Sequence, residues 1–466
     1  MTKPNIILIN CDDLGYGDLG CYGSPVNKTP TLDRMAAEGV RFTDYHVMSP
    51  VCSASRAALM TGCYPERVGF PGVLFPGQDI GLHPDEITIA DVLKGQGYRT
   101  KIVGKWHCGD QPPFLPTNHG FDEYYGIPYS NDMGIQGKPE NHAKKVPLPL
   151  MRDDEVIQEQ PDQRGLTERY MEQCVRFIRD ASTGSAQATP FFLYLAHMYV
   201  HVPLFVPRRF LNQSENGGYG GAVECIDWVA EVIFHELRKL GLDENTLVIF
   251  TSDNGSRARG EGGSNAPLRG HKAQTWEGGQ RVACIVRWPG KIPAGRVCDE
   301  LVTSMDFMPT LAALAGTTEP KDRIIDGKDI RSLWFGEAGA ESPHEVFFYY
   351  ARKNLAAVRK GKWKLHFIEG SAFGGDAEPN PQLYDLESDI GEQNNVYDKY
   401  PDIVKELEAA AEAGREELGD ALHNIEGAGC RPVGRVDNPK PLCEYDENHP
   451  YIVAAYDTPD TKVMGG

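Results

Sequence analysis

The chain has 466 residues, with 47 Lys and Arg against 66 Asp and Glu, which gives a formal net charge of −19. This length accommodates one large α/β domain and a smaller one, and a hydrophobic content of 41% is ordinary for a globular protein. The negative charge argues against a broad binding surface for nucleic acid or an anionic membrane. An anionic small substrate would therefore need a local cluster of basic residues or a metal ion.

The N-terminus and the cysteines bear on the cellular compartment. Residues 1–10 lead into an apolar strand pattern without a signal-peptide region, and no stretch has the apolar length that spans a bilayer. The 11 cysteines are scattered, without the paired spacing of a zinc site, which favours a reducing compartment. We expect a cytoplasmic protein, or a secreted or periplasmic one trimmed to its mature start. The oligomeric state stays open.

Apolar runs and helix-period stretches alternate along the first part of the chain. Strands are expected at residues 5–10, 99–103, 191–196, 246–251 and 282–287, and helices at 30–38, 55–61, 87–95, 166–181, 222–240 and 305–315. This alternation predicts an α/β fold, with a large and mostly parallel sheet sandwiched by helices.

The pattern changes near residue 345. Residues 345–350, 355–359 and 363–367 have the pattern of short antiparallel strands, and a charged helix is expected at about 401–418. We predict a catalytic domain over residues 1–345 and a smaller α+β domain with an antiparallel sheet over 346–466. The tail from about residue 425 is expected to be extended.

Acidic and amide side chains follow two of the expected strands. Asp12 and Asp13 come after the first strand, and Asp253 and Asn254 after the strand at 246–251. One Asp-Asp pair after a strand is more often a loop or helix-capping feature. In an open α/β sheet, however, ligands bind beyond the carboxyl ends of the strands. Two such ends carrying hard oxygen ligands predict a Ca²⁺ or Mg²⁺ site rather than a zinc site.

The segment 49–65, SPVCSASRAALMTGCYP, places Cys52 just ahead of an expected helix. Ser53 and Ser55 are candidate N-caps, which would put the thiol at a helix N-terminus that favours anions. Arg56 opposes the helix dipole in the first turn, yet its guanidinium suits an oxyanion. From this segment alone, a buried cysteine with an incidental arginine is the simpler interpretation.

The segment CSASR at 52–56, followed by AALMTG, resembles the signature of the type I sulfatases, whose cysteine is oxidised to formylglycine. The resemblance continues in order through the whole chain. Its other motifs are NIILINCDDLGYGDLGCYG (5–23), GKWHCG (104–109), GIPYSNDMG (126–134), HVPLFVP (201–207), TSDNG (251–255), LRGHKAQTWEGG (268–279), SMDFMPTLAALAG (304–316) and LYDLESDIGEQNNV (383–396). They are most similar to the branch that includes arylsulfatase A and N-acetylgalactosamine-6-sulfatase. The resemblance implies an alkaline-phosphatase-like fold and hydrolysis of sulfate esters.

The resemblance also implies a role for the residues already singled out. Cys52 would become formylglycine, whose hydrated form has two geminal hydroxyls: one attacks sulfur, and the other expels sulfate as the aldehyde re-forms. Asp12, Asp13, Asp253 and Asn254 would hold the metal, Ca²⁺ or alternatively Mg²⁺. Arg56 would hold the nucleophile and its charge.

The remaining basic residues of the motifs take roles by the same resemblance. Lys105 would bind the sulfate group, and His107 would be the base that deprotonates the second hydroxyl. Ser130 would contact a sulfate oxygen or order its neighbours. Taken singly, Lys105 and His107 would be interpreted as a solvated lysine and a structural loop histidine.

A further pair would act at the leaving oxygen. The resemblance implies that His201 and Lys272 bind sulfate and protonate the departing alkoxide. Clustered basic groups near a metal are expected to depress the pKa of lysine, which favours proton donation. His271, beside Lys272, is the best candidate for a substrate contact.

The chain departs from the usual signature at Ala54, where proline is normal. Oxygen-dependent maturation reads Cys-x-Pro-x-Arg, whereas the radical type of maturation enzyme found in anaerobes tolerates alanine. We therefore expect a maturation enzyme of that type as a partner, in the cytosol of an anaerobic bacterium.

The substrate is expected to be a small sulfate ester, with a sulfated saccharide such as galactose or N-acetylgalactosamine sulfate, from glycosaminoglycan or mucin, preferred to a phenolic sulfate. An arylsulfatase, a phosphate or phosphonate ester hydrolase of the same superfamily, and a catalytically silent binding protein are the alternatives. Specificity is expected in the loops 70–82, 131–165, 208–221 and 255–271.

Overall fold

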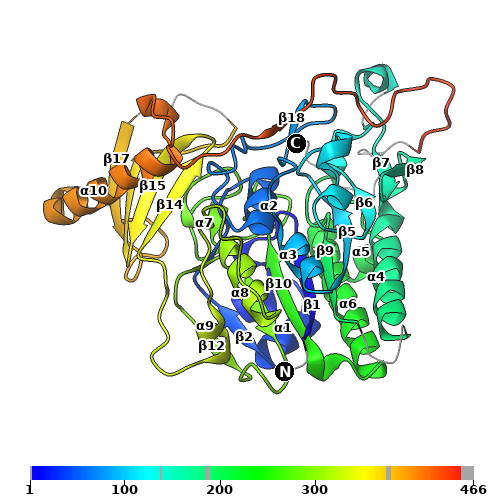
Figure 1. The fold of residues 1–466 in the computed structure, drawn as a ribbon, viewed down its shortest axis with the longest axis horizontal. Helices are drawn as coiled ribbons and strands as arrows, with labels where there is room; N and C mark the ends of the chain where they lie inside the picture. Colours follow the sequence, from blue (N-terminus) through cyan, green and yellow to red (C-terminus); the bar gives the residue numbers. More distant parts are fainter. Residues whose placement is uncertain (1–2, 137–138, 184–188, 374–378, 453–466) are drawn as a thin grey trace.

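A ten-stranded mixed sheet forms the centre of the computed structural model, which describes residues 3–136, 139–183, 189–373 and 379–452 (Figure 1). In spatial order the strands are β12 (Arg296–Cys298), β2 (Val40–Phe42), β11 (Cys284–Arg287), β10 (Thr246–Ser252), β1 (Asn5–Cys11), β9 (Phe191–Ala196), β5 (Arg99–Lys105), β6 (Glu123–Ile127), β7 (Pro149–Arg152) and β8 (Glu155–Glu159).

The central strands of this sheet are parallel. β1 pairs with β10 on one side and β9 on the other, β5 pairs with β9 and β6, and Cys11 lies opposite Ser252. Three pairs on either side of these strands are antiparallel: β11 with β10, β7 with β6, and β8 with β7. The prediction of a large, mostly parallel sheet is confirmed, although the apolar run at 282–287 contributes an antiparallel strand.

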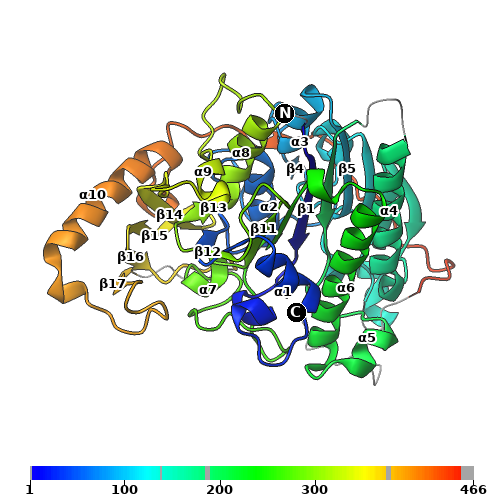
Figure 2. The ribbon, with the colours of Figure 1, turned by 90° about the horizontal axis from the view of Figure 1, so that it is seen from below.

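Helices cover both faces of the sheet. They are α1 (Pro30–Ala37), α2 (Cys52–Thr61), α3 (Ile89–Gly95), α4 (Leu166–Thr183), α5 (Arg208–Gln213), α6 (Gly217–Lys239), α7 (Glu277–Gln280), α8 (Phe307–Leu314) and α9 (Arg331–Phe335). Because side chains alternate along a strand, Ile7 and Ile9 pack with α1, α4 and α6, whereas Ile6 and Leu8 pack with α2, α3 and α8. Figure 2 shows α4 and α6 side by side along the sheet.

A second sheet lies at one end of the molecule (Figure 1). It is antiparallel, in the order β14 (Val346–Ala351), β15 (Asn354–Lys360), β16 (Trp363–Ile368) and β17 (Pro379–Asp385), and α10 (Pro401–Leu418) packs against it. The predicted antiparallel sheet is therefore confirmed. The domain division at residue 345 stays a prediction.

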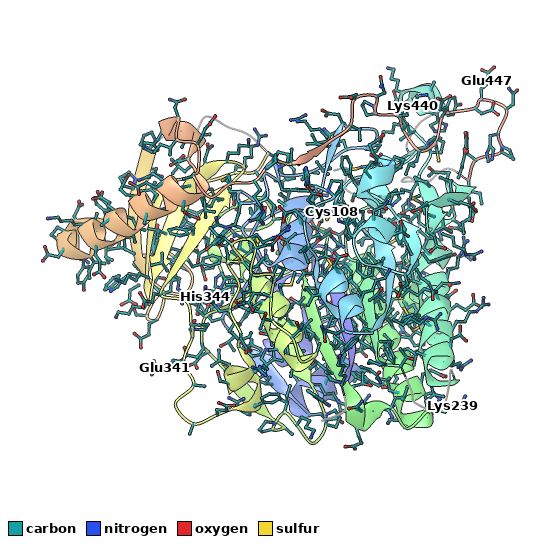
Figure 3. All side chains as sticks on the ribbon, in the orientation of Figure 1. Cys108, Lys239, Glu341, His344, Lys440 and Glu447 are labelled. Atoms are coloured by element: carbon teal, nitrogen blue, oxygen red, sulfur yellow. The ribbon has the colours of Figure 1, made fainter. Side chains whose placement is uncertain are left out.

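The C-terminal segment returns along the larger part of the molecule. β18 (Gly434–Arg435) pairs with β4 (Ile80–Gly81), and Lys440 and Glu447 mark its course further on (Figure 3). The predicted tail beyond residue 452, and residues 137–138 of the predicted loop 131–165, lie outside the described residues. Within the described part of the chain, no helix has both the length and the apolar character to cross a membrane.

Candidate active site

The two acidic strand ends meet, because β1 and β10 are parallel neighbours. The backbone N–H of Asp13 donates to Asp253 Oδ1 at 3.2 Å, and the Asn254 amide nitrogen donates to Asp13 Oδ1 at 2.7 Å. Asp12, Asp13, Asp253 and Asn254 are all at most 2% exposed. Three carboxylates and one amide thus share a buried space at the carboxyl edge of the sheet, where the sequence predicts them.

Cys52 is the first residue of α2 and is 2% exposed. The prediction that Ser53 or Ser55 caps this helix is wrong. Val51 is the N-cap, and no side chain caps the helix. The Ser53 hydroxyl instead accepts a hydrogen bond from the backbone N–H of Leu74 at 3.1 Å. Ser53 therefore holds the loop at Leu74 against the helix, and the helix begins at Cys52.

Arg56 connects this helix to both sides of the acidic group. Its Nε donates to Asp253 Oδ2 at 2.8 Å, and its Nη1 donates to the Lys105 carbonyl oxygen at 2.8 Å. The Lys105 ammonium donates in turn to Asp12 Oδ2 at 2.6 Å and to the Ser130 hydroxyl at 3.3 Å. Arg56 and Lys105 are at most 1% exposed, so these buried charges are paired and oriented.

Lys272 and His201 approach the same carboxylate. The Lys272 ammonium lies 2.8 Å from Asp13 Oδ1 and 2.9 Å from Oδ2, and His201 Nε2 lies 3.8 Å from Oδ2. His201 Nδ1 is 2.5 Å from the Val202 carbonyl oxygen, which places a proton on Nδ1 and turns Nε2 towards the acidic group. The pair predicted to act together therefore converges on one point.

His107 lies directly after the strand that ends at Lys105. Its Nε2 contacts the Leu74 carbonyl oxygen at 3.0 Å, so Nε2 carries the proton and Nδ1, which is buried without a partner, is free to accept one. The backbone of His107 has φ +62, a conformation that positions the ring in the site. Its neighbour Cys108 lies inside the molecule, near α2 (Figure 3).

His271 does not join this group by any contact found among the described residues. Its ring is partly buried, and its Nδ1 contacts the carbonyl oxygen of Lys272 at 2.8 Å. Asp132, which the sequence analysis did not single out, does belong to the site. Its carboxylate interacts with Ser130, His201, Lys105 and Lys272. The signal available for it was its place in the motif GIPYSNDMG, two residues after Ser130.

The residues present suit a divalent cation with oxygen ligands. Asp12 Oδ1 and Asn254 Oδ1 are buried without a hydrogen-bond partner. Burial raises the pKa of Asp253, and Asp12 raises it further against the opposing charge of Arg56. Crowded carboxylates with unused oxygens are the environment that Ca²⁺ or Mg²⁺ stabilises.

The expectation that lysine pKa values fall beside a bound metal stays a prediction, and the protein's own groups have the following effects. Burial alone would lower the pKa of Lys272, but Asp13 and the other nearby acids raise it above the ordinary value. Asp12 has the same effect on the pKa of Lys105. Among the charged groups, the carboxylate that each lysine contacts therefore affects the pKa of that lysine more than the other cations do.

A second acidic group, Asp44, His46 and Glu277, lies between the two sheets and differs in kind. Arg359 binds Asp44 with distances of 3.0 and 2.6 Å, and Lys364 binds Glu277 at 2.9 Å. These carboxylates are neutralised by protein cations, so the group is structural. Lys364 also donates to the Thr275 carbonyl oxygen at 2.9 Å, which ties the C-terminal sheet to the segment that follows Lys272.

Comparison with known proteins agrees with this geometry. Residues 4–317 match the family described as Sulfatase, and residues 342–435 match the C-terminal region of aryl-sulfatase. Bos taurus arylsulfatase A is 41% identical over 442 residues, which cover 87% of this chain and 85% of that protein. N-acetylgalactosamine-6-sulfatase from Canis lupus familiaris is 42% identical over 384 residues, covering 78% and 72%.

Solved structures agree as well. Ps i-CgsB, in a crystal structure with k-i-k-neocarrahexaose, is 31% identical with a TM-score of 0.78, covering 92% of this chain and 96% of that one. The fold is thus the alkaline-phosphatase-like fold of the sulfatases. This chain belongs to the sulfatase family and is a sulfuric ester hydrolase.

Proposed function

We propose that this enzyme removes sulfate from a sulfated sugar, such as galactose or N-acetylgalactosamine sulfate from glycosaminoglycan or mucin, using formylglycine at position 52 and a divalent cation. The observation that carries the proposal is the position of Cys52. The residue begins a helix beside four oxygen ligands, and Lys105 and Lys272 are the cations that act on it most strongly. A nucleophile at position 52 would lie next to an anion bound by the metal and these two lysines.

An unmodified thiol does not suit this chemistry. Burial raises the pKa of Cys52 although Lys105 and Lys272 oppose it, so the thiol stays protonated and is a poor nucleophile. Oxidised to formylglycine and hydrated, the residue would supply two hydroxyls, one to attack sulfur and one to release sulfate. We also propose a maturation enzyme that accepts Ala54 in the recognition sequence.

The cation would be held by Asp12, Asp13, Asp253 and Asn254, and Ca²⁺ is preferred to Mg²⁺. When bound, it would neutralise charge on a sulfate oxygen. Arg56 keeps Asp253 oriented, and Lys105, which would also bind the sulfate group, does the same for Asp12. Both roles follow from paired, buried side chains rather than from flexible surface charges.

Two proton transfers are assigned to histidine and lysine side chains. Burial lowers the pKa of His107 well below its ordinary value, and the Lys105 charge lowers it further, so the ring is neutral and can take a proton at Nδ1. Lys272, or His201 Nε2 when both ring nitrogens carry a proton, would give the proton to the leaving oxygen. Asp13 holds Lys272 in place, and the Val202 carbonyl oxygen orients His201.

The choice of a sugar rests on relatives. One is an N-acetylgalactosamine-6-sulfatase, and Ps i-CgsB was solved with a neocarrahexaose. Arylsulfatase A is a relative of similar identity, which keeps phenolic sulfates as the alternative. A phosphate or phosphonate ester is the other alternative, because related folds accommodate different reactions.

Two measurements test the proposal together. Mass spectrometry of peptide 42–56 from protein made in its native host should show an aldehyde in place of the Cys52 thiol. The same protein should hydrolyse at least one member of a panel of galactose and N-acetylgalactosamine sulfates with a higher kcat/KM than 4-nitrophenyl sulfate or phenyl phosphonate. An intact thiol in active protein would contradict the nucleophile, and a preference for the aryl or phosphonate ester would contradict the substrate.

A further inference from the structure

Asp132 is an acidic residue inside a site built to bind an anion. It lies in a single turn, Asn131–Met133, that follows β6 and begins after Ser130. Its Oδ1 is buried and has no hydrogen-bond partner. The roles proposed above for metal, sulfate and proton transfer do not use it, so this carboxylate has a different purpose.

Asp132 is ionised in this position. Burial would raise its pKa, but the charge of His201, a hydrogen bond from Ser130 and the charges of Lys105 and Lys272 outweigh burial and bring the pKa below the ordinary value. An ionised carboxylate only accepts hydrogen bonds. Any substrate group that binds to it must therefore be a donor.

The turn is fixed on the leaving-group side of the site. The Asn131 amide nitrogen donates to the Gln163 side chain at 3.0 Å and to the Pro203 carbonyl oxygen at 3.2 Å, two residues beyond His201. Gln163 returns a hydrogen bond to the Asn131 carbonyl oxygen at 3.1 Å. Asn131 is thereby tied to the segment that carries His201, and the charge of His201 acts on the neighbouring Asp132 more strongly than the charges of Lys105 and Lys272 do. The alcohol part of the ester is expected on this side, because His201 would protonate the leaving oxygen.

We propose that Asp132 is a specificity residue that accepts a hydrogen bond from a hydroxyl on the carbon next to the sulfated carbon of the substrate. This inference rests on the proposed function and narrows it. It selects a sulfate ester with a neighbouring hydroxyl, as on a secondary position of a sugar ring, and disfavours esters without a donor there. Without that donor, the buried Oδ1 of Asp132 has no hydrogen-bond partner, which penalises the wrong ester.

The test uses small esters that differ in one hydroxyl. Cyclohexyl sulfate and the cis and trans isomers of 2-hydroxycyclohexyl sulfate are measured as competitive inhibitors of 4-nitrophenyl sulfate hydrolysis. In the wild type, at least one hydroxylated isomer should bind on the order of ten- to hundredfold more tightly than cyclohexyl sulfate, the range for a hydrogen bond to a charged group. Equal inhibition by all three would overturn the proposal without using any variant.

Asp132→Asn then identifies the residue. The variant should reduce the preference, measured as the ratio of the inhibition constants of cyclohexyl sulfate and its hydroxylated isomer, to about threefold or less. This ratio is read within one protein, so it does not depend on how the variant changes kcat/KM for 4-nitrophenyl sulfate. Asp154→Asn, the same change at an exposed carboxylate of the β7–β8 turn, should keep the full preference.

Other results would assign Asp132 to charge balance instead. A uniform change in the binding of all four esters, or a preference that persists in Asp132→Asn, would refute the specificity role. Wild-type protein that fails to hydrolyse 4-nitrophenyl sulfate and every sugar sulfate would contradict the proposed function itself, which is a separate outcome.

Discussion

Removing Lys272 or His201 should slow the hydrolysis of sugar sulfates far more than that of aryl sulfates. Both side chains converge on Asp13, with the Lys272 ammonium at 2.8 Å and His201 Nε2 at 3.8 Å. If they donate the proton to the leaving oxygen, they matter most when that oxygen is strongly basic, as in a sugar alkoxide. A nitrophenolate departs with little help.

The magnitude follows from the role. General acid catalysis contributes about 100- to 10 000-fold, which corresponds to roughly 2.7 to 5.4 kcal/mol of barrier at 1.36 kcal/mol per tenfold. Lys272→Ala and His201→Ala should each lose this factor in kcat/KM on a sugar sulfate and about tenfold or less on 4-nitrophenyl sulfate. Because the two residues share Asp13, the double variant should lose less than the product of the single losses.

The assay compares kcat/KM for both substrates, with thermal unfolding measured in Ca²⁺ to verify folding. Lys101→Ala is the matched control, because Lys101 is a buried lysine of β5 whose side chain is 7% exposed, as is that of Lys272, and it pairs with Glu123 at 2.9 Å. In Lys101→Ala, kcat/KM for the sugar sulfate and for 4-nitrophenyl sulfate should change by the same factor. Equal losses on both substrates for Lys272→Ala and His201→Ala would show that these residues bind sulfate and donate no proton.

Further expectations concern the nucleophile, the metal and a buried acid. Cys52→Ala should abolish turnover and preserve the unfolding transition, because a small buried side chain is replaced by another; more than a few per cent of wild-type activity would contradict the formylglycine assignment. Chelated wild-type protein should gain about 2.7 kcal/mol of stability in Ca²⁺ at 100 times its Kd, and Asp253→Ala should gain none, which thermal unfolding with and without Ca²⁺ can test. Burial raises the pKa of Glu66 to about 8, so the folded state holds a proton that the unfolded state releases near 4.5, and stability should fall as pH rises between these values. Glu66→Gln should remove that fall, worth roughly 1.4 kcal/mol per pKa unit, in denaturant unfolding measured from pH 4 to 9; the same slope in the variant would exclude Glu66 as its source.

The sequence predicted the parts of the site that depend on local rules. Asp12 and Asp253 could be placed together because parallel strands present their carboxyl ends at one edge, and both strands are continuous apolar runs. Three of the four strands of the C-terminal sheet could be placed from their short patterns, which are typical of antiparallel pairing, whereas β17 was not predicted.

The sequence was insufficient where a side chain's role depends on a contact with a residue far away in the chain. Ser53 has the chemistry of a helix cap, but the backbone of Leu74 takes its hydroxyl. Asp132 lies in the motif GIPYSNDMG, which the sequence offered, but its relation to His201 depends on tertiary contacts such as the hydrogen bond from Asn131 to the Pro203 carbonyl oxygen.

The burial of Cys52 limits when the proposed maturation could take place. At 2% exposure on a packed helix, the thiol cannot be reached by another enzyme once the domain has folded. The chain that encloses it is made late, because Asp253, the partner of Arg56, lies 197 residues further along. At about 5–20 residues per second, the ribosome needs roughly 10 to 40 s to synthesise that distance. If Cys52 is oxidised as proposed, the reaction has to precede the closing of this chain around it. Faster synthesis, or a maturation enzyme that arrives late, would then yield folded protein that can no longer be activated.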